Sequence, residues 1–252
     1  MSGHSKWANI KHRKAKADAE RGKMFTKVAR EILVAARQGG PDPEANFRLR
    51  MAIERARAVN MPNDSIMRAI KRGAGESGTE TYEEIVYEGY GPGGVAIMVE
   101  AMTDNRNRAA SDIRHIFTRH GGNLGESGCV AWMFRKKGLL VVDLAESKMS
   151  EDDLMNLAVE AGAEDLKVDG STVEITTDPA DFEKVQKYLK DHGVAFTVAE
   201  LTWLPQTTVR VTGKDARQVL SLTEELEDLD DVQQVHANFD IPDEEMEAAA
   251  EE

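Results

Sequence analysis

The sequence has few of the features from which disulfides, membrane spans and export signals are built. Its 252 residues include one cysteine, Cys129, which excludes a disulfide within the chain and a zinc site made of cysteines. No apolar run approaches the roughly 20 residues that span a bilayer. The basic N-terminus lacks the apolar core of a secretory signal. We therefore expect a cytoplasmic protein in a reducing compartment.

The sequence also lacks the motifs of an active site. Its six histidines are scattered, and His115 and His120 are five residues apart, which does not place them on one helix face as a metal pair. The glycine run Gly89–Gly94 precedes an expected strand, whereas a phosphate-binding loop opens a helix. We therefore predict a turn at these glycines and expect no enzyme activity, no cofactor and no metal.

Charge is distributed unevenly along the chain. Residues 1–72 hold 17 Lys+Arg and 7 Asp+Glu, whereas the remaining 180 residues hold 15 Lys+Arg and 38 Asp+Glu. The whole chain carries a formal charge of −13, which conceals this cationic front end. A polyanion would be attracted to the first part and repelled by the rest, so nucleic acid is the predicted partner.

The first part of the chain is predicted to be a small helical domain behind a lysine-rich arm. Apolar residues recur at helical spacing from Lys23 to Arg37 and again before and after the break at residues 61–64. Asp42 is expected to cap the second helix, with Pro43 at its first position. Gly73 is expected to close the third helix.

After residue 81 the pattern changes to strands alternating with helices. One half-unit is expected at 84–88, 95–102, a helix from Asp104 or Asn105 to about 120, and 130–134. A second half-unit is expected at 207–212, 215–226 and 232–239. Residues between 139 and 201 follow the order βαββαβ of a ferredoxin-like domain.

Each outer half-unit is too small to bury a sheet face alone, so we predict that the two form one domain around an insertion. The predicted fold is α+β, with an N-terminal three-helix domain and two ferredoxin-like α/β domains, one inserted in the other. The boundaries are 1–78, 79–136 with 205–240, 137–204, and an acidic tail at 241–252. Three consecutive domains would leave both half-units uncovered.

Cationic side chains of the front end are the candidate contacts to phosphates. Lys23, Lys27, Arg30 and Arg37 fall within roughly 80° on a helical wheel, opposite the apolar stripe, and we call them the basic ridge. Arg68, Lys71 and Arg72 extend the charge along the third helix. Most charged stripes are only solvated surface, but those usually mix signs. The predicted site is Lys6, Trp7, Lys11, Arg13, Lys14, Lys16, Lys23, Lys27, Arg30, Arg37, Arg106 and Arg108.

Three members of this set leave alternatives open. Trp7 could stack on a base or anchor the arm on the helices. Arg106 and Arg108 lie at the start of an expected helix, where the helix dipole disfavours positive charge. Their presence there has two equally supported explanations, a binding role and simple exposure at the surface.

Four long motifs resemble the signature of the YebC family. They are GHSKWANIKHRKAKADAERGKMFTK (Gly3–Lys27), YEGYGPGG (Tyr87–Gly94), TDNRNR (Thr103–Arg108) and SDIRHIFTRHGGNLGESGCVAWMF (Ser111–Phe134). The resemblance runs from the arm to about residue 240. It implies a helical N-terminal domain and two α/β domains, one inserted in the other.

The resemblance also implies a non-enzymatic regulator of gene expression. The family is described as probable transcriptional regulators that bind DNA, and its mitochondrial relatives are translational activators of cytochrome c oxidase. Bacterial members are linked to ribosomes stalled on proline-rich stretches. We expect a DNA-binding transcriptional regulator, with a ribosome-associated factor that binds ribosomal RNA as the alternative. The sequence shows no plainly polar recognition helix, which keeps the RNA alternative open.

Overall fold

The computed structural model describes residues 20–75, 81–147, 149–242 and 244–246. Contacts within this part of the chain define two compact units. The first unit contains residues 20–129 and 214–235, and the second contains residues 130–213 and 236–246. Helices come first and antiparallel sheets follow, so the predicted α+β class is confirmed.

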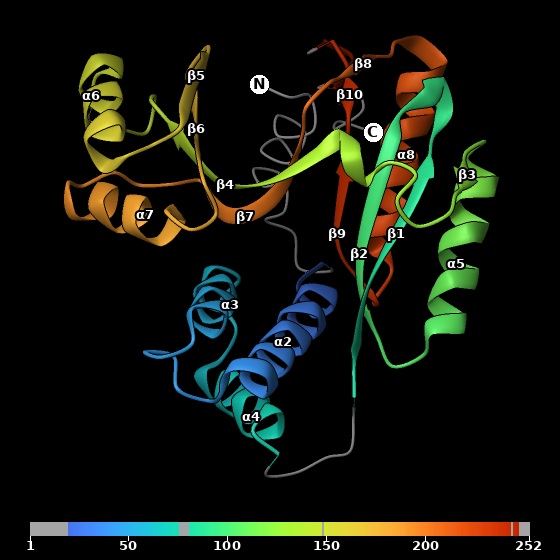
Figure 1. Cartoon of the computed structure of the whole chain (residues 1–252), viewed down its shortest axis with the longest axis horizontal. Coiled ribbons are helices and arrows are strands. Elements are labelled where there is room, and N and C mark those ends of the chain that lie inside the picture. The colour runs from blue at the N-terminus through green and yellow to red at the C-terminus, as the bar shows by residue number, and fades with distance from the viewer. Residues whose placement is uncertain (1–19, 76–80, 148, 243, 247–252) are drawn as a thin grey trace. The chain divides into compact units, whose positions relative to one another are not determined.

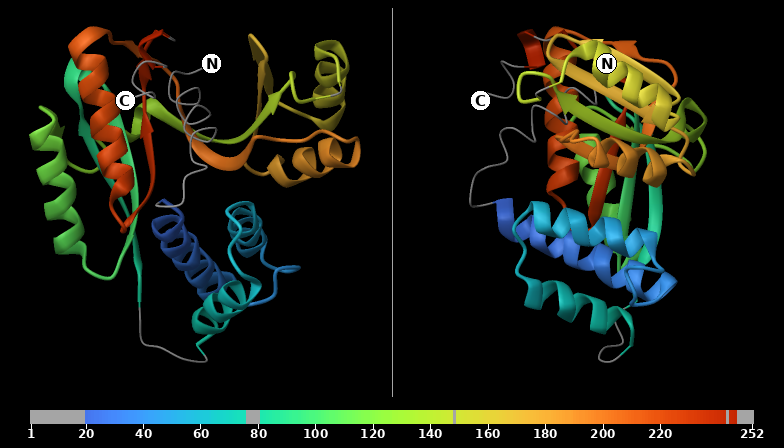
Figure 2. Two further views of the ribbon diagram at one scale, coloured as in Figure 1. Left: turned by 180° about the vertical axis from the view of Figure 1, so that it is seen from behind. Right: turned by 90° about the vertical axis from the view of Figure 1, so that its left-hand side faces the viewer.

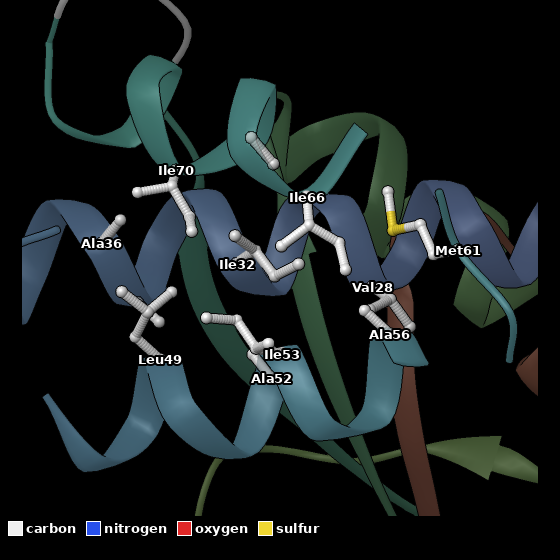
Figure 3. Close-up of a cluster of buried hydrophobic side chains, with 12 residues drawn as sticks. Val28, Ile32, Ala36, Leu49, Ala52, Ile53, Ala56, Met61, Ile66 and Ile70 are labelled. Carbon is white, nitrogen blue, oxygen red and sulfur yellow. The ribbon is translucent and has the colours of Figure 1, made fainter. Parts of the chain in front are cut away.

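Three helices open the first unit: α2 (Glu20–Gly39), α3 (Phe47–Ala58) and α4 (Asn63–Gly73). Their apolar faces meet in one cluster, in which side chains from all three helices point toward one another (Figure 3). Ile32, Leu49 and Ala56 are fully buried there. The predicted helical stripes therefore form a common core.

The second helix begins later than predicted. Asp42 does not cap it; its carboxylate instead accepts a hydrogen bond from the amide of Glu44 at 3.0 Å, within a turn. Asn46 is the cap of α3 and accepts from the amide of Leu49 at 3.1 Å. Asn46 is the cap in place of Asp42 because its side-chain amide also donates to two carbonyls at the end of α2. The carboxylate of Asp42 has no hydrogen to donate.

A four-stranded sheet of order β3-β1-β2-β9 completes the first unit (Figure 1). Its strands are β1 (Glu83–Tyr90), β2 (Ala96–Thr103), β3 (Asn123–Leu124) and β9 (Val232–Ala237). The helices α5 (Arg106–Arg119) and α8 (Gly213–Asp228) accompany it. The two helices lie next to each other, because the carboxylate of Glu225 in α8 pairs with Arg119 at the end of α5 and lies 2.6 Å from His120, which caps that helix.

Two expected strands of this region differ from the prediction, one by its absence and one by its length and pairing. Residues 130–134 are not a strand, because Ala131–Met133 form a short 3-10 helix and the third strand of the sheet is β3 instead. The strand expected at 207–212 is reduced to β8 (Val209–Arg210), which pairs in parallel with β10 (Phe239–Asp240) in a separate two-stranded sheet. The turn expected at Gly89–Gly94 is present and holds a 3-10 turn at Pro92–Gly94.

The second unit contains a contiguous ferredoxin-like sheet. Its elements are β4 (Phe134–Asp143), α6 (Glu151–Ala161), β5 (Asp165–Asp169), β6 (Thr172–Thr177), α7 (Phe182–Asp191) and β7 (Val198–Pro205). The strand order is β5-β6-β4-β7, and all neighbours are antiparallel. A Cβ atom at Gly138 would lie 2.3 Å from the Phe182 ring, which shows how closely α7 packs on β4 (Figure 2).

No helix in the described ranges is long and apolar enough to cross a membrane.

Candidate nucleic-acid interface

The apolar face of α2 fixes the direction of its cations. Val28, Ile32 and Ala36 are buried against α3 and α4, so the basic ridge lies on the other side of the helix. The predicted common face of Lys23, Lys27 and Arg30 is present. It does not face solvent as expected, however, but contacts the C-terminal end of α8 and the residues that follow it.

Arg30 lies at the centre of this contact. Its guanidinium donates to the carbonyls of Met102 and Asp230, at 2.9 and 2.6 Å, and to the carboxylate of Asp231 at 3.1 Å. Its guanidinium carbon also lies 4.8 Å from the centre of the Tyr82 ring, as in a cation–π interaction. The side chains of Arg30 and Asp231 are only 11% and 12% exposed. Arg30 therefore holds α2 against the sheet.

Lys27 and Lys23 continue the same contact along α2. The ammonium of Lys27 donates to the carbonyl of Glu227, one of the last carbonyls of α8. Burial lowers the pKa of Lys27, and the nearby carboxylates of Glu227 and Asp228 oppose that change. Lys23 is more exposed and lies 3.4 Å from the carboxylate of Asp228. Lys27 and Lys23 thus contact the negatively charged C-terminal end of α8, and Arg30 contacts the residues that follow it, so three of the four ridge residues are engaged within the first unit.

Asp231 also holds the start of α5. Its carboxylate accepts from the hydroxyl of Thr103 and from Arg108, both at 2.9 Å. Arg108 donates to Asp104 as well, at 2.7 Å, and its hydrogen bonds to the two carboxylates raise its pKa. The pairing of Arg108 with Asp104 and Asp231 therefore explains why a cation stands at the start of α5. Arg106, two residues earlier, is exposed and pairs with no carboxylate in the described ranges.

Most arginines of α3 are also engaged within the first unit. Arg48 lies 2.8 Å from Glu84 and donates to Gln38. Arg55 pairs with Glu31 at 3.1 Å. Arg50 donates to the carbonyl of Pro43 at 2.6 Å. Arg57, by contrast, is exposed at the end of the helix.

The exposed side of α4 carries a cationic surface that the site prediction omitted. Ile66, Ala69 and Ile70 are buried, so the residues at the complementary helical positions face outward. We call this surface, made of Met67, Arg68, Lys71 and Arg72, the α4 face. All four residues are exposed, and Met67 is 52% exposed. Their charge was visible in the sequence, but only the burial of the opposite face shows that they share one surface.

The remaining predicted site residues divide into two groups. Arg37 is exposed in the last turn of α2, one residue after Ala36, whose side chain borders Gly73 at the end of α4. Arg37 therefore lies near the C-terminal turn of α4. Lys6, Trp7, Lys11, Arg13, Lys14 and Lys16 lie outside the described residues.

Titratable groups in the described ranges form no candidate metal or nucleophile site. No group of three or more His, Cys, Asp or Glu residues in these ranges could hold a metal ion. Cys129 is half-buried, and burial together with the carboxylate of Glu88 raises the pKa of its thiol. A raised thiol pKa leaves little thiolate at neutral pH, so Cys129 is not an activated nucleophile.

The described chain consists of three cationic helices followed by antiparallel β-sheets with accompanying helices. This architecture is that of a multidomain α+β protein with a positively charged helical region. The chain belongs to the TACO1/YebC family. Residues 5–76 match the model described as the TACO1/YebC protein N-terminal domain, and residues 82–239 match the model of the second and third domain.

Similar proteins cover almost the whole chain. One from Natranaerobius thermophilus is 59% identical over 248 residues, covering 98% of this chain and 99% of its own length. One from Pelotomaculum thermopropionicum is 59% identical and covers 96% of this chain and 100% of its own length. Both are named "Probable transcriptional regulatory protein".

A solved structure has the same fold. It is the crystal structure of a conserved hypothetical protein from Aquifex aeolicus, 52% identical, with a TM-score of 0.83. The match covers 91% of this chain and 94% of that one.

Proposed function

We propose that this protein is a non-enzymatic regulator of gene expression that binds DNA through its N-terminal helical domain. The observation that carries the proposal is the α4 face, which presents Arg68, Lys71 and Arg72 to solvent from a helix packed on α2. The names of the relatives support a role in transcription.

The α4 face suits contact with a phosphate backbone. Arg68, Lys71 and Arg72 are three and four residues apart, so successive turns of one helix place their charges in a row. Only Asp64 adds an acidic side chain to this side of α4. The connection from α3 to α4, residues 59–62, has the length found between the helices of helix-turn-helix motifs. The cations of the arm, from Lys6 to Lys16, would add further phosphate contacts.

The helix dipole offers a simpler reason for two of these cations. Lys71 and Arg72 lie in the last turn of α4, where positive charge stabilises any helix. Arg68 lies before the last turn and bonds the carbonyl of Asp64 and the hydroxyl of Ser65. Because both explanations predict a stable helix, only a binding measurement separates them.

The test is a triple charge reversal on the full chain, Arg68→Glu, Lys71→Glu and Arg72→Glu. Binding to a DNA duplex is measured by fluorescence anisotropy at several salt concentrations. If the three side chains contact phosphates, the slope of log K against log salt becomes less steep by about 2.7. Affinity at low salt falls together with the slope.

A matched variant controls for net charge. Lys184→Glu, Lys187→Glu and Lys190→Glu alter three exposed residues of α7 and change the formal charge of the chain by the same amount. This variant should keep a steeper salt slope than the α4 variant. Equal slopes for the two folded variants, checked by circular dichroism, would refute a phosphate-binding role for the α4 face.

A further inference from the structure

An exposed tryptophan stands at the start of the ferredoxin-like sheet. Trp132 lies in the 3-10 helix Ala131–Met133, directly before β4, and 68% of its surface is exposed. Large aromatic side chains gain free energy from burial, so an indole kept at the surface is a candidate contact for a partner.

Gln206 fixes the backbone beneath this indole. Its amide nitrogen donates to the carbonyl of Met133 at 2.8 Å, and its side-chain amide donates to the carbonyl of Trp132 at 2.9 Å. The side-chain oxygen of Gln206 accepts from Nε of Arg135, also at 2.9 Å. One residue thus holds both the aromatic turn and the guanidinium that follows it. Such preorganisation reduces the entropy lost when a ligand binds.

Two cations follow this turn in the sequence. Arg135 and Lys136 are exposed, and neither pairs with a carboxylate in the described ranges. Their neighbour Lys137, by contrast, lies 2.5 Å from Glu164. Adjacent residues of a strand point to opposite sides, so the two charges lie on either side of the start of β4. The chain beyond residue 72 has an excess of acidic residues, so cations that pair with no described carboxylate, next to an exposed indole, indicate a site for an anionic ligand.

A hollow next to the turn limits where phosphates can lie. Its volume is about 220 Å³, and Arg135, Lys137 and Gln206 line one part of it. Glu164, Asp165 and Glu174 line another part. These carboxylates repel phosphate, so a polyanion would avoid that part and contact the hollow only at its guanidinium edge.

We propose that Trp132, Arg135 and Lys136 form a binding subsite for single-stranded nucleic acid. One base stacks on the indole, and the adjoining phosphates contact the guanidinium and the ammonium. A duplex is excluded from this stacking, because its base faces are covered by neighbouring bases. The proposal rests on the proposed nucleic-acid binding and specifies that the bound molecule includes an unpaired stretch, in DNA or in RNA.

The first test reports stacking directly. Trp7→Phe and Trp203→Phe in the full chain leave Trp132 as the single tryptophan. Its fluorescence is titrated with a 12-nucleotide oligo(U), a 12-nucleotide oligo(dT) and a 12-base-pair duplex. We expect quenching by one or both single strands and little by the duplex. The oligonucleotide that quenches the fluorescence more strongly identifies RNA or DNA as the source of the stacked base.

The second test measures affinity in the chain with its natural tryptophans. Trp132→Ala should weaken oligonucleotide binding by about 5-fold to about 150-fold, the range for losing one stacked base. Trp132→Phe keeps an aromatic face and should retain most of the affinity. Val159→Ala is the control, because Val159 is 72% exposed on α6 and should have no effect.

The outcomes separate this proposal from the function on which it rests. Unchanged binding by folded Trp132→Ala, together with weaker binding by the α4 variant, would overturn the subsite and leave the proposed function standing. Failure of the full chain to bind any nucleic acid would overturn both. Loss of self-association in Trp132→Ala, with nucleic-acid affinity intact, would overturn the subsite and identify Trp132 as a protein contact.

Discussion

At the residue scale, Asn46 joins two helices through one side chain. It accepts from the amide of Leu49 at the start of α3, and its amide group donates to the carbonyls of Ala35 and Gly40 at the end of α2, both at 2.8 Å. The side chain is buried, so the bonds to Leu49 and Ala35 are shielded from water and the bond to Gly40 is partly shielded. Asn46 therefore sets the angle at which α3 leaves α2.

Asn46→Ala should destabilise the first unit by about 2–4 kcal/mol. The loss combines a helix cap, worth about 1 kcal/mol, with two carbonyls deprived of their donor in a shielded place. Asn46→Asp keeps the cap but places a carboxylate oxygen against the carbonyls of Ala35 and Gly40, so its loss reports the two donated bonds together with this repulsion. Urea unfolding followed by circular dichroism measures both. A cost below about 0.5 kcal/mol for Asn46→Ala would show that water replaces these bonds.

At the element scale, α2 and α4 touch at a position that admits no side chain. A Cβ atom on Gly73 would lie 2.4 Å from the carbonyl oxygen of Leu33 and 2.8 Å from the Cβ atom of Ala36. Gly22, near the start of α2, has nothing within 4 Å of its hypothetical Cβ atom. The same substitution therefore has opposite consequences at the two glycines.

Gly73→Ala should destabilise the helical core by about 1–3 kcal/mol, because the helices must separate to admit a methyl group. Gly22→Ala should stabilise the protein by up to about 1 kcal/mol, since alanine is the better helix former and nothing obstructs it. Thermal unfolding of the two variants, measured side by side, checks the difference in sign. Two changes of the same sign would contradict the close contact.

Periodicity predicted most elements but not the partners of their polar faces. The cap of α5, expected at Asp104 or Asn105, is Asn105, and the helix expected at 151–161 is present, because both follow local rules. The start of α3 was wrong because Asn46 gains its advantage from carbonyls of another helix, which no local pattern reveals. The basic ridge was misjudged for the same reason: its partners are residues 227–231, about 200 positions away.

At the scale of the whole molecule, long-range ion pairs make the first unit one body. Arg30 binds Asp230 and Asp231, which follow α8, and Lys27 binds the carbonyl of Glu227 in the last turn of α8. Leu33 and Val34 pack with Met102 of β2. The helical region predicted as a separate domain at 1–78 is therefore bonded to the sheet of the same unit. We expect α2–α4 and this sheet to unfold together.

Hydrogen exchange in increasing urea, read by mass spectrometry, tests this cooperativity. Peptides from α2 and β2 should lose protection at one urea concentration, and peptides from β6 of the second unit at another. Arg30→Met leaves Asp231 without its buried partner and should release α2 earlier than β2. Arg68→Met is the control, because it removes an exposed arginine. In this variant α2 and β2 should still lose protection at the same urea concentration. Separate loss of α2 and β2 in the natural chain would contradict the prediction.

The split of the first sheet across the chain has a consequence during translation. The strands β1, β2 and β3, which end at residue 124, leave the ribosome well before α8, which begins at residue 213, and before β9, which completes their sheet from residue 232. The contiguous sheet of residues 134–205 can acquire its native pairing while the earlier strands still wait for theirs. Apolar residues of β2 lack their neighbours in α8 and β9 throughout that interval. A nascent chain of this protein is thus most open to aggregation or chaperone capture until its last residues have been synthesised.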